Sequence, residues 1–452
     1  MMTNQDSHHT TSSTDQSLAS SSLWQQQLDY YQRLGIHAWH GRVPYKITNT
    51  WSLAQHYANI SAQYLISYFN QYPEHKKANI IELGTGLGQF SHRYMTCLIH
   101  ALQHHPSIIR RLNLILCDAS DKVLNYLRHH PQLQQLPAID YVKLCVLPNH
   151  ISPWPNHISL QSGACVIIAN YFFDSLYQNA FYVEHNQVKL ASINQESNNV
   201  PFHFSPSNHT GPFYRDRSLE AIIHQHKHLN IERFLIPEGT FNLLALLTQK
   251  TDSYCLLCSD KGHIDFTHES YDAYFNFCRD GPWSSNVNFF ALDRYITTSL
   301  GGHGWMTHEP LPCYETNLCT GIWTNLKDHT HLIQKASEQL LSTHNSLDIH
   351  ICTQRLLSTP PPDLQTLNSI WRLNAYEPEL LNIFYDQLTP LSPAQLQHIL
   401  PFDLMVKRIS YTPFPSTQSL LKKYIHLADH AQHQQSLMQL KAMYRSWFGS
   451  LS

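Results

Sequence analysis

The sequence predicts an α/β fold, in which a mainly parallel sheet carries helices on both faces, followed by a C-terminal all-α domain. Apolar runs of strand length alternate with helical stretches from residue 79 onward, and this alternation implies right-handed crossovers and a parallel sheet. A glycine-rich turn follows the first strand. Three consecutive prolines, 360–362, then separate the sheet region from a final helical stretch.

Composition limits the possible classes of protein. The 452 residues predict about three domains at ~150 residues each. With 30 Lys and Arg against 33 Asp and Glu, a strongly basic nucleic-acid module is disfavoured. A hydrophobic fraction of 42% argues against global disorder, and no run approaches the ~20 apolar residues of a membrane helix. We therefore expect a cytoplasmic protein without nucleic-acid or membrane partners.

Cysteine and histidine do not predict a metal site. The ten cysteines lie mostly within apolar runs, as expected of reduced structural thiols. Cys255 and Cys258 have C-x-x-C spacing, but the nearest second pair, Cys313 and Cys319, does not have the spacing of a zinc site. The 32 histidines contain no H-E-x-x-H motif.

The N-terminal part divides into a tail and a cap. Residues 1–22, rich in Ser, Thr, Gln and His, predict a disordered tail. Residues 23–78 predict a helical cap, because aromatic residues recur at helical spacing, with an interrupting loop over 39–51.

Residues 79–330 predict the sheet domain. Its strands are expected at 79–83, 112–117, 141–147, 164–169, 180–183, 254–258 and 321–323, and its helices at 89–105 and 121–129. The stretch of about 185–240 shows little periodicity, which indicates an insertion.

The C-terminal part predicts a linker over 331–362 and a helical domain over 363–452. Ser392-Pro393 has the pattern of a helix N-cap followed by proline at the first helical position. Segments 419–431 and 434–447 predict a helix pair. A tetratricopeptide-type repeat stays an open alternative, since no clean ~34-residue period is found.

The turn from Glu82 to Gly88 reads E-L-G-T-G-L-G. Glycines allow the backbone to approach a ligand closely. A dinucleotide site expects G-x-G-x-x-G, but here the third glycine comes one residue early, which disfavours a nicotinamide-dependent oxidoreductase. A nucleotide P-loop is excluded because G-K-[ST] is absent. An acid beside the turn suits a ligand with a cationic end and no phosphate, such as S-adenosylmethionine.

Asp118 ends the second strand and follows Gly88 by 30 positions, which leaves room for one helix and one strand. A carboxylate there can accept both ribose hydroxyls, and ligands of open α/β sheets bind at this carboxyl edge. The predicted cofactor contacts are Glu82, Gly84, Thr85, Gly86, Gly88, Asp118, Ala119 and Asn170.

Asn170 ends the buried strand 164–169 and is followed by aromatic residues and Asp174. An Asn carbonyl at this edge can hold an N–H of the substrate, so that the nitrogen lone pair points at the methyl group. Asp174 can stabilise charge or cap the next helix, and both readings stay open. We therefore predict Asn170 and Asp174 as catalytic residues.

This order of motifs resembles class I S-adenosylmethionine-dependent methyltransferases, and more narrowly the MidA-like family, which includes the mitochondrial complex I assembly methyltransferase. The resemblance covers roughly 23–326 and implies a Rossmann-like sheet and methyl transfer. The family motifs are matched by Glu82–Gly88, by Asp118–Ser120, by Asn170, Phe172, Asp174 and Leu176, and by Leu235–Gly239 and Val287–Phe289; Val43–Thr48 takes the place of a family loop near the cofactor.

One position departs from the family pattern, since Tyr171 replaces a Glu. Members of the family methylate protein arginine, whose guanidinium such carboxylates would neutralise. We therefore predict methyl transfer to a protein or other large acceptor. The alternative is a catalytically silent interaction protein that binds a partner through its C-terminal helices.

Overall fold

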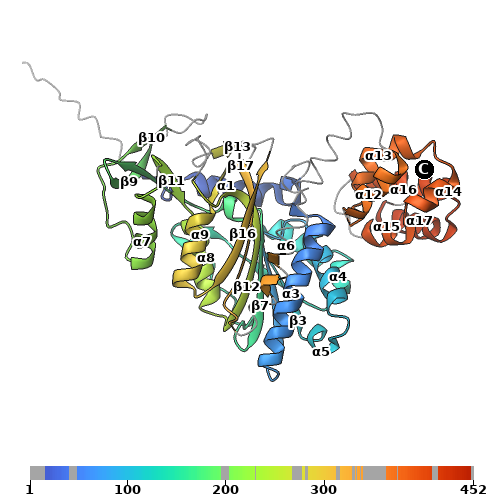
Figure 1. The fold of residues 1–452 in the computed structure, drawn as a ribbon, viewed down its shortest axis with the longest axis horizontal. Helices are drawn as coiled ribbons and strands as arrows, with labels where there is room; N and C mark the ends of the chain where they lie inside the picture. Colours follow the sequence, from blue (N-terminus) through green and yellow to red (C-terminus); the bar gives the residue numbers. More distant parts are fainter. Residues whose placement is uncertain are drawn as a thin grey trace, which may run out of the picture.

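The computed structural model describes residues 16–39, 48–194, 203–229, 231–266, 277–279, 283–311, 316–327, 331, 333–335, 337–338, 363–373, 375–409 and 416–448. Three parts are visible in Figure 1: a central sheet covered by helices, a smaller sheet on one side, and a helical C-terminal domain on the other.

The central sheet confirms the predicted α/β class. Its strand order is β16-β17-β12-β7-β2-β3-β4, with a short β15 paired to β12. All pairings from β4 to β12 are parallel, whereas β17 is antiparallel to both of its neighbours. This is the doubly wound order with one antiparallel strand added near an edge. The bounds are β2 Lys77–Leu83, β3 Leu112–Asp118, β4 Ala138–Lys143, β7 Gly163–Asn170, β12 Ser253–His263, β15 Val287–Asn288, β16 His303–Leu311 and β17 Thr316–Thr324.

The direction in which the chain adds strands reverses between β2 and β7, because β3 lies on one side of β2 and β7 on the other. Ligands of open α/β sheets bind at this switch point, outside the carboxyl ends of the strands. Glu82, Asp118 and Asn170 all come from these ends, so the fold places the three predicted motifs at one edge.

Both faces of the sheet are covered, which explains why its strands are continuous apolar runs. Ile80 packs with α3 (Trp51–Gln71), α4 (Gln89–Ala101) and α6 (Asp121–Arg128), whereas its neighbour Ile81 packs with α8 (Glu238–Thr248) and α9 (Phe289–Ser299). Cys255 and Cys258 of β12 likewise lie in the cores of opposite faces and are both buried free thiols. The two thiols of this C-x-x-C pair therefore lie on opposite faces of the sheet.

The smaller sheet corrects the expected position of one strand. Its order is β1-β9-β8-β11, with β10 also paired to β9, and helix α7 (Arg217–His226) precedes β11. The expected strand 180–183 belongs here and not to the central sheet, since its partners are β9 and β11. The bounds are β1 Gln16–Ser17, β8 Asn179–Glu184, β9 Gln187–Asn194, β10 His203–Pro206 and β11 Arg233–Ile236.

The predicted 1–22 tail is wrong from residue 16 onward. Gln16 and Ser17 pair with β9, and Leu18 is fully buried. Residues 1–15 lie outside the described part of the chain. Helix α1 (Leu23–Leu34) and the 3-10 helix η1 (Gly35–Trp39) follow. In the expected loop over 39–51, residues 40–47 are not described.

Shorter elements complete the α/β part. They are α5 (Pro106–Ile109), the 3-10 helices η2 (Leu133–Gln135) and η3 (Phe173–Ser175), the hairpin of β5 (Val146–Leu147) and β6 (His150–Ile151), and the ribbon of β13 (Phe277–Arg279) and β14 (Trp283–Ser285). Helix α4 ends at Ala101 and not at His105, because α5 begins at Pro106 and the residue before a proline disfavours helical backbone.

The C-terminal domain has a core of its own, built around Trp371, Phe384 and Tyr424. Its helices are α12 Leu364–Leu373, α13 Leu380–Leu388, α14 Pro393–Ile399, α15 Phe402–Ile409, α16 Ser416–His430 and α17 Gln434–Phe448. Ser392 caps α14 in a capping box with Gln395, and the helix pair is present as α16 and α17. Among the described residues, no helix combines the length and apolarity needed to cross a bilayer.

Candidate active site

The glycine-rich turn connects β2 to α4 and is tied to the neighbouring strand β3. The Thr85 hydroxyl donates to the carbonyl oxygens of Glu82 and Cys117, at 3.2 Å in both cases, and the Thr85 N–H also donates to Cys117. Gly84, Gly86 and Gly88 have φ angles of 68°, 55° and 72°. These angles favour glycine, so the turn is fixed by its own backbone.

Gly84 also has no room for a side chain. A Cβ atom there would lie 2.5 Å from Cδ2 of Phe172, which follows the third motif. Backbone conformation and close packing therefore both require glycine at this position. The contact joins the glycine-rich turn to the segment that follows Asn170.

Asp118 joins the turn to the end of β3. Its Oδ2 accepts the N–H of Gly86 at 3.2 Å and its Oδ1 accepts the N–H of Ser120 at 2.9 Å. Burial raises the pKa of Asp118 to about 6, although backbone hydrogen bonds oppose this shift. A carboxylate offers about four lone-pair positions, so Asp118 retains capacity for two ribose hydroxyls.

Glu82 lies behind the turn, is buried, and accepts a hydrogen bond from the Ser91 hydroxyl. Burial raises the pKa of Glu82 to about 8, and the nearby charge of Asp118 adds to the shift. Glu82 is therefore mainly protonated at pH 7 without ligand. Glu82 does not line the cavity described below, and its contact with a cofactor stays a prediction.

A cavity of about 740 Å³, open space at its mouth included, adjoins this edge. Among the described residues that line it, Asp118 is the only charged one, and most of the others are apolar or aromatic. They include Trp24, Leu28, Tyr31, Gly84, Asp118, Ala119, Val123, Leu144, Tyr171, Phe172 and Tyr177.

Helix α1 forms one wall of the cavity, a role that no sequence motif predicted. The Gln27 Nε2 group donates to the Ser175 carbonyl at 2.8 Å, and the Trp24 indole N–H donates to the Leu18 carbonyl at 2.8 Å. Trp24, Leu28 and Tyr31 have i, i+4, i+7 spacing. This stripe could have indicated a packed face, but not that the face covers a ligand site.

Asn170 ends β7 beside the cavity wall formed by Tyr171 and Phe172. Its Nδ2 group donates to the Thr48 carbonyl at 3.4 Å. Its Oδ1 atom is buried, and no hydrogen-bond donor within the described residues reaches it. A buried acceptor without a donor is uncommon, so this atom is suited to receive an N–H from outside the chain.

Tyr171 holds a left-handed backbone with φ of 51°, and its N–H donates to the Ser259 carbonyl at 2.8 Å. A bulky residue in this conformation costs about 1–3 kcal/mol. The Tyr171 side chain lines the cavity, at the position where the pattern of the resembled family has Glu.

Asp174 does not line the cavity. It lies in η3, 3.7 Å from Lys261 Nζ, with side-chain exposures of 3% and 10% for the pair. Burial raises the pKa of Asp174, and Lys261 partly offsets the shift. Neighbouring Asp260 accepts the N–H groups of Phe172 and Asp174, both at 3.1 Å. Asp260 and Lys261 hold this turn, and no sequence motif marks either residue.

The predicted site residues thus divide into two groups. Gly84, Asp118 and Ala119 line the cavity, whereas Glu82, Thr85, Gly86, Gly88 and Asn170 support or adjoin its walls. In the described part of the chain, no cluster of three His, Cys, Asp or Glu side chains could hold a metal ion. Of the family loop 43–48, only Thr48 is described.

Residues 60–270 match a family model described as "Putative S-adenosyl-L-methionine-dependent methyltransferase". The match covers 211 of the 452 residues and agrees with the predicted S-adenosylmethionine-dependent methyltransferase. The chain matches no curated protein.

Three solved structures resemble this chain at low sequence identity. An uncharacterized protein from Burkholderia thailandensis shares 10% identity over 67% of this chain and 86% of its own, with a TM-score of 0.41. A second Burkholderia thailandensis protein, bound to S-adenosyl-homocysteine, shares 11% identity over 61% and 78%, with a TM-score of 0.40. The plantazolicin methyltransferase BpumL, in complex with S-adenosyl-homocysteine, shares 10% sequence identity over 67% of this chain and 99% of its own, with a TM-score of 0.29.

The residues of the methyltransferase fit S-adenosylmethionine. Gly84 and Asp118 both line the cavity, and Asp118 can accept the ribose hydroxyls. The described lining contains no basic side chain that would select a phosphate. The chemistry of the site therefore agrees with a cationic, phosphate-free cofactor.

Proposed function

We propose that this methyltransferase transfers the methyl group of S-adenosylmethionine to a nitrogen of a protein or other large acceptor. The observation that carries this proposal is the Asn170 carboxamide, whose Nδ2 is engaged by Thr48 while its Oδ1 has no donor among the described residues. An acceptor N–H that donates to Oδ1 orients the nitrogen lone pair.

When bound, S-adenosylmethionine supplies an electrophilic methyl group on a sulfonium sulfur. The chain's own residues position the reactants: Asp118 holds the ribose, and Asn170 Oδ1 holds the acceptor N–H. The apolar walls from α1 and Tyr171 to Tyr177 exclude water. Orientation and desolvation of this kind supply most of the acceleration in an in-line displacement.

The acceptor nitrogen is proposed to be uncharged. Asp118 is the only carboxylate in the described lining and is assigned to the ribose, while Tyr171 stands where an acid would pair with arginine. A large acceptor is favoured because two regions flank the catalytic edge: the smaller sheet, whose β8 begins after Tyr177, and the C-terminal domain, which contacts Trp51.

Tritium-labelled S-adenosylmethionine and fractionated host lysate test the proposal. We expect label to enter the protein fraction with the wild-type enzyme, and more slowly with Asp118→Ala when S-adenosylmethionine is limiting. Peptide mapping is expected to place the methyl group on an amide or other neutral nitrogen that bears hydrogen. Label confined to lipid or to small molecules would contradict a protein acceptor, and no labelled product at all would favour the silent interaction protein.

A further inference from the structure

The carboxylate of Glu377 connects the C-terminal domain to the methyltransferase domain. Glu377 lies between α12 and α13 and is 7% exposed. It forms a two-pronged ion pair with Arg93 of α4, at 2.8 Å from Nη2 to Oε1 and 3.1 Å from Nη1 to Oε2. Its Oε2 also accepts the backbone N–H of Trp51, the first residue of α3, at 3.0 Å.

Arg408 of α15 contacts the indole side chain of Trp51. The Trp51 indole N–H donates to the Arg408 carbonyl at 3.3 Å, and the Arg408 guanidinium lies 4.1 Å from the centre of the Trp51 ring. Trp51 is only 2% exposed, and a desolvated cation over an indole is a favourable contact. The C-terminal domain thus fixes both the backbone and the ring of Trp51.

From Trp51 the contacts lead back to the proposed catalytic residue. Arg93 also donates to the carbonyl of Asn49, and the carbonyl of Thr48 accepts the Asn170 Nδ2 group. Arg93 itself lies in the second turn of α4, the helix that begins after Gly88. One buried ion pair therefore contacts both the segment 48–51 and the helix of the cofactor turn.

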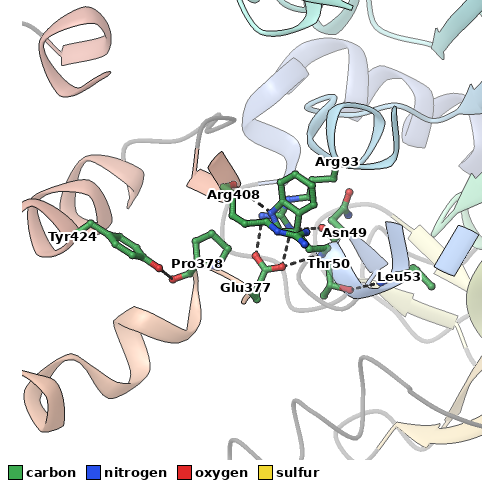
Figure 2. A network of polar contacts seen from close by, with 9 residues as sticks. Asn49, Thr50, Leu53, Arg93, Glu377, Pro378, Arg408 and Tyr424 are labelled. Atoms are coloured by element: carbon green, nitrogen blue, oxygen red, sulfur yellow. Dashed lines mark hydrogen bonds and ion pairs between the residues drawn. The ribbon is translucent and has the colours of Figure 1, made fainter. Parts of the chain in front are cut away.

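The turn that presents Glu377 is held in a strained conformation. Ala375 and Tyr376 have φ angles of 48° and 58°, and the Tyr376 N–H donates to the Trp371 carbonyl at 2.7 Å. Pro378 accepts a hydrogen bond from buried Tyr424 at 3.4 Å (Figure 2). Two adjacent non-glycine residues in this region persist only where the surrounding structure enforces them, so Glu377 is presented from a rigid turn.

We propose that Glu377 and Arg408 are positioning residues for methyl transfer. By holding Trp51 and Arg93, they fix the segment 48–51, and Thr48 in turn fixes the carboxamide of Asn170. The C-terminal domain is then part of the catalytic apparatus and not only a tethered binding module. This inference rests on the role proposed for Asn170 and extends the site to residues more than 200 positions away in sequence.

The test uses the full-length protein with Glu377→Gln and Glu377→Ala. The control Glu379→Gln makes the same chemical change two residues on, at an exposed position. Hydrogen exchange is followed in peptides covering 48–53 and 167–173. We expect faster exchange in both peptides for the two Glu377 variants, and wild-type exchange for the control.

Kinetics provide the second readout. We expect kcat for methyl transfer to fall about tenfold in Glu377→Gln, while the Kd for S-adenosyl-homocysteine stays within about twofold. Should Glu377→Ala fail to fold by circular dichroism, Arg408→Lys replaces it, because Lys keeps the charge but loses the planar stack. We expect a smaller change in the same direction.

The outcomes separate the inference from the proposed function. Unchanged exchange in 167–173, or an unchanged kcat despite faster exchange in 48–53, overturns the positioning role while methyl transfer stands. A wild-type protein that labels no acceptor overturns the proposed function, and the exchange of 167–173 still decides whether Glu377 orders the Asn170 segment.

Discussion

The cofactor half and the acceptor half of the site are built in different ways. The cofactor half consists of the turn 82–88 and Asp118, which bond mainly to each other and to the ends of β2 and β3. The acceptor half consists of Asn170–Asp174, whose partners are Thr48, Ser259, Asp260 and Lys261. The first half is local in sequence, whereas the second depends on distant segments.

This difference separates binding from positioning. A cofactor site made of backbone and one carboxylate persists as long as two adjacent strands persist. An acceptor site held by remote side chains can be disturbed from outside the cavity, through β12, through α1 or through the C-terminal domain. Perturbations of the two halves are therefore expected to affect different measured quantities.

The largest effect is expected from Lys261→Met in the acceptor half. Removal of the ammonium leaves Asp174 and Asp260 buried together, which we expect to lower the free energy of unfolding by about 3–5 kcal/mol. Urea denaturation measures the loss. Lys143→Met is the matched control, because Lys143 pairs with Asp121 at side-chain exposures of 48% and 73%, and such pairs contribute below about 1 kcal/mol. Equal losses would contradict a special role for the buried cluster.

Asn170→Ala tests the acceptor half without altering the cofactor half. We expect the rate of methyl transfer to fall about 100-fold because the acceptor is no longer oriented. The affinity for S-adenosyl-homocysteine, measured by calorimetry, is expected to stay near the wild-type value. Exposed Asn125→Ala in α6 serves as the control. A variant that binds and transfers normally would remove Asn170 from the mechanism.

Asp118→Ala is the corresponding test of the cofactor half. Loss of charge-assisted hydrogen bonds is expected to weaken S-adenosyl-homocysteine binding by about 1.5–3 kcal/mol, measured by isothermal titration calorimetry. Asp121→Ala, three residues on and exposed, is expected to bind as wild type. If both variants keep full affinity, the ribose is held elsewhere.

The smallest effect is expected from pH. Because burial raises the pKa of Asp118 to about 6, the carboxyl group is mostly protonated at pH 5 and mostly ionised at pH 7. The ionised form accepts both ribose hydroxyls, so affinity is expected to fall about tenfold from pH 7 to pH 5. Titrations across this range check the slope, and Asp118→Asn is expected to flatten it. A wild-type affinity independent of pH would assign ribose binding to another group.

The same contrast explains which parts of the site could be predicted. The turn 82–88, Asp118 and Asn170 each follow a strand, and parallel strands bring their carboxyl ends to one edge. A strand–turn–helix pattern is readable over a few residues. The central sheet was predictable for the same reason, since burial on both faces makes its strands continuous apolar runs.

The other residues that build the site are not marked by any local sequence pattern. Lys261 continues a strand, Gln27 lies in an ordinary amphipathic helix, and Glu377 precedes a proline in a turn. Each acquires its role only when segments far apart in sequence pack together. The strands within 185–240 were missed because polar residues, Asn and Pro obscure the alternating pattern of a small sheet.

The buried residue Leu18, which precedes α1, determines where this enzyme can be truncated. Its carbonyl is the partner of the Trp24 indole, and Trp24 lines the cavity. A recombinant protein trimmed to begin at α1 would keep every predicted motif and yet lose this anchor of the cavity wall. Truncation boundaries belong before Gln16, where the first strand begins.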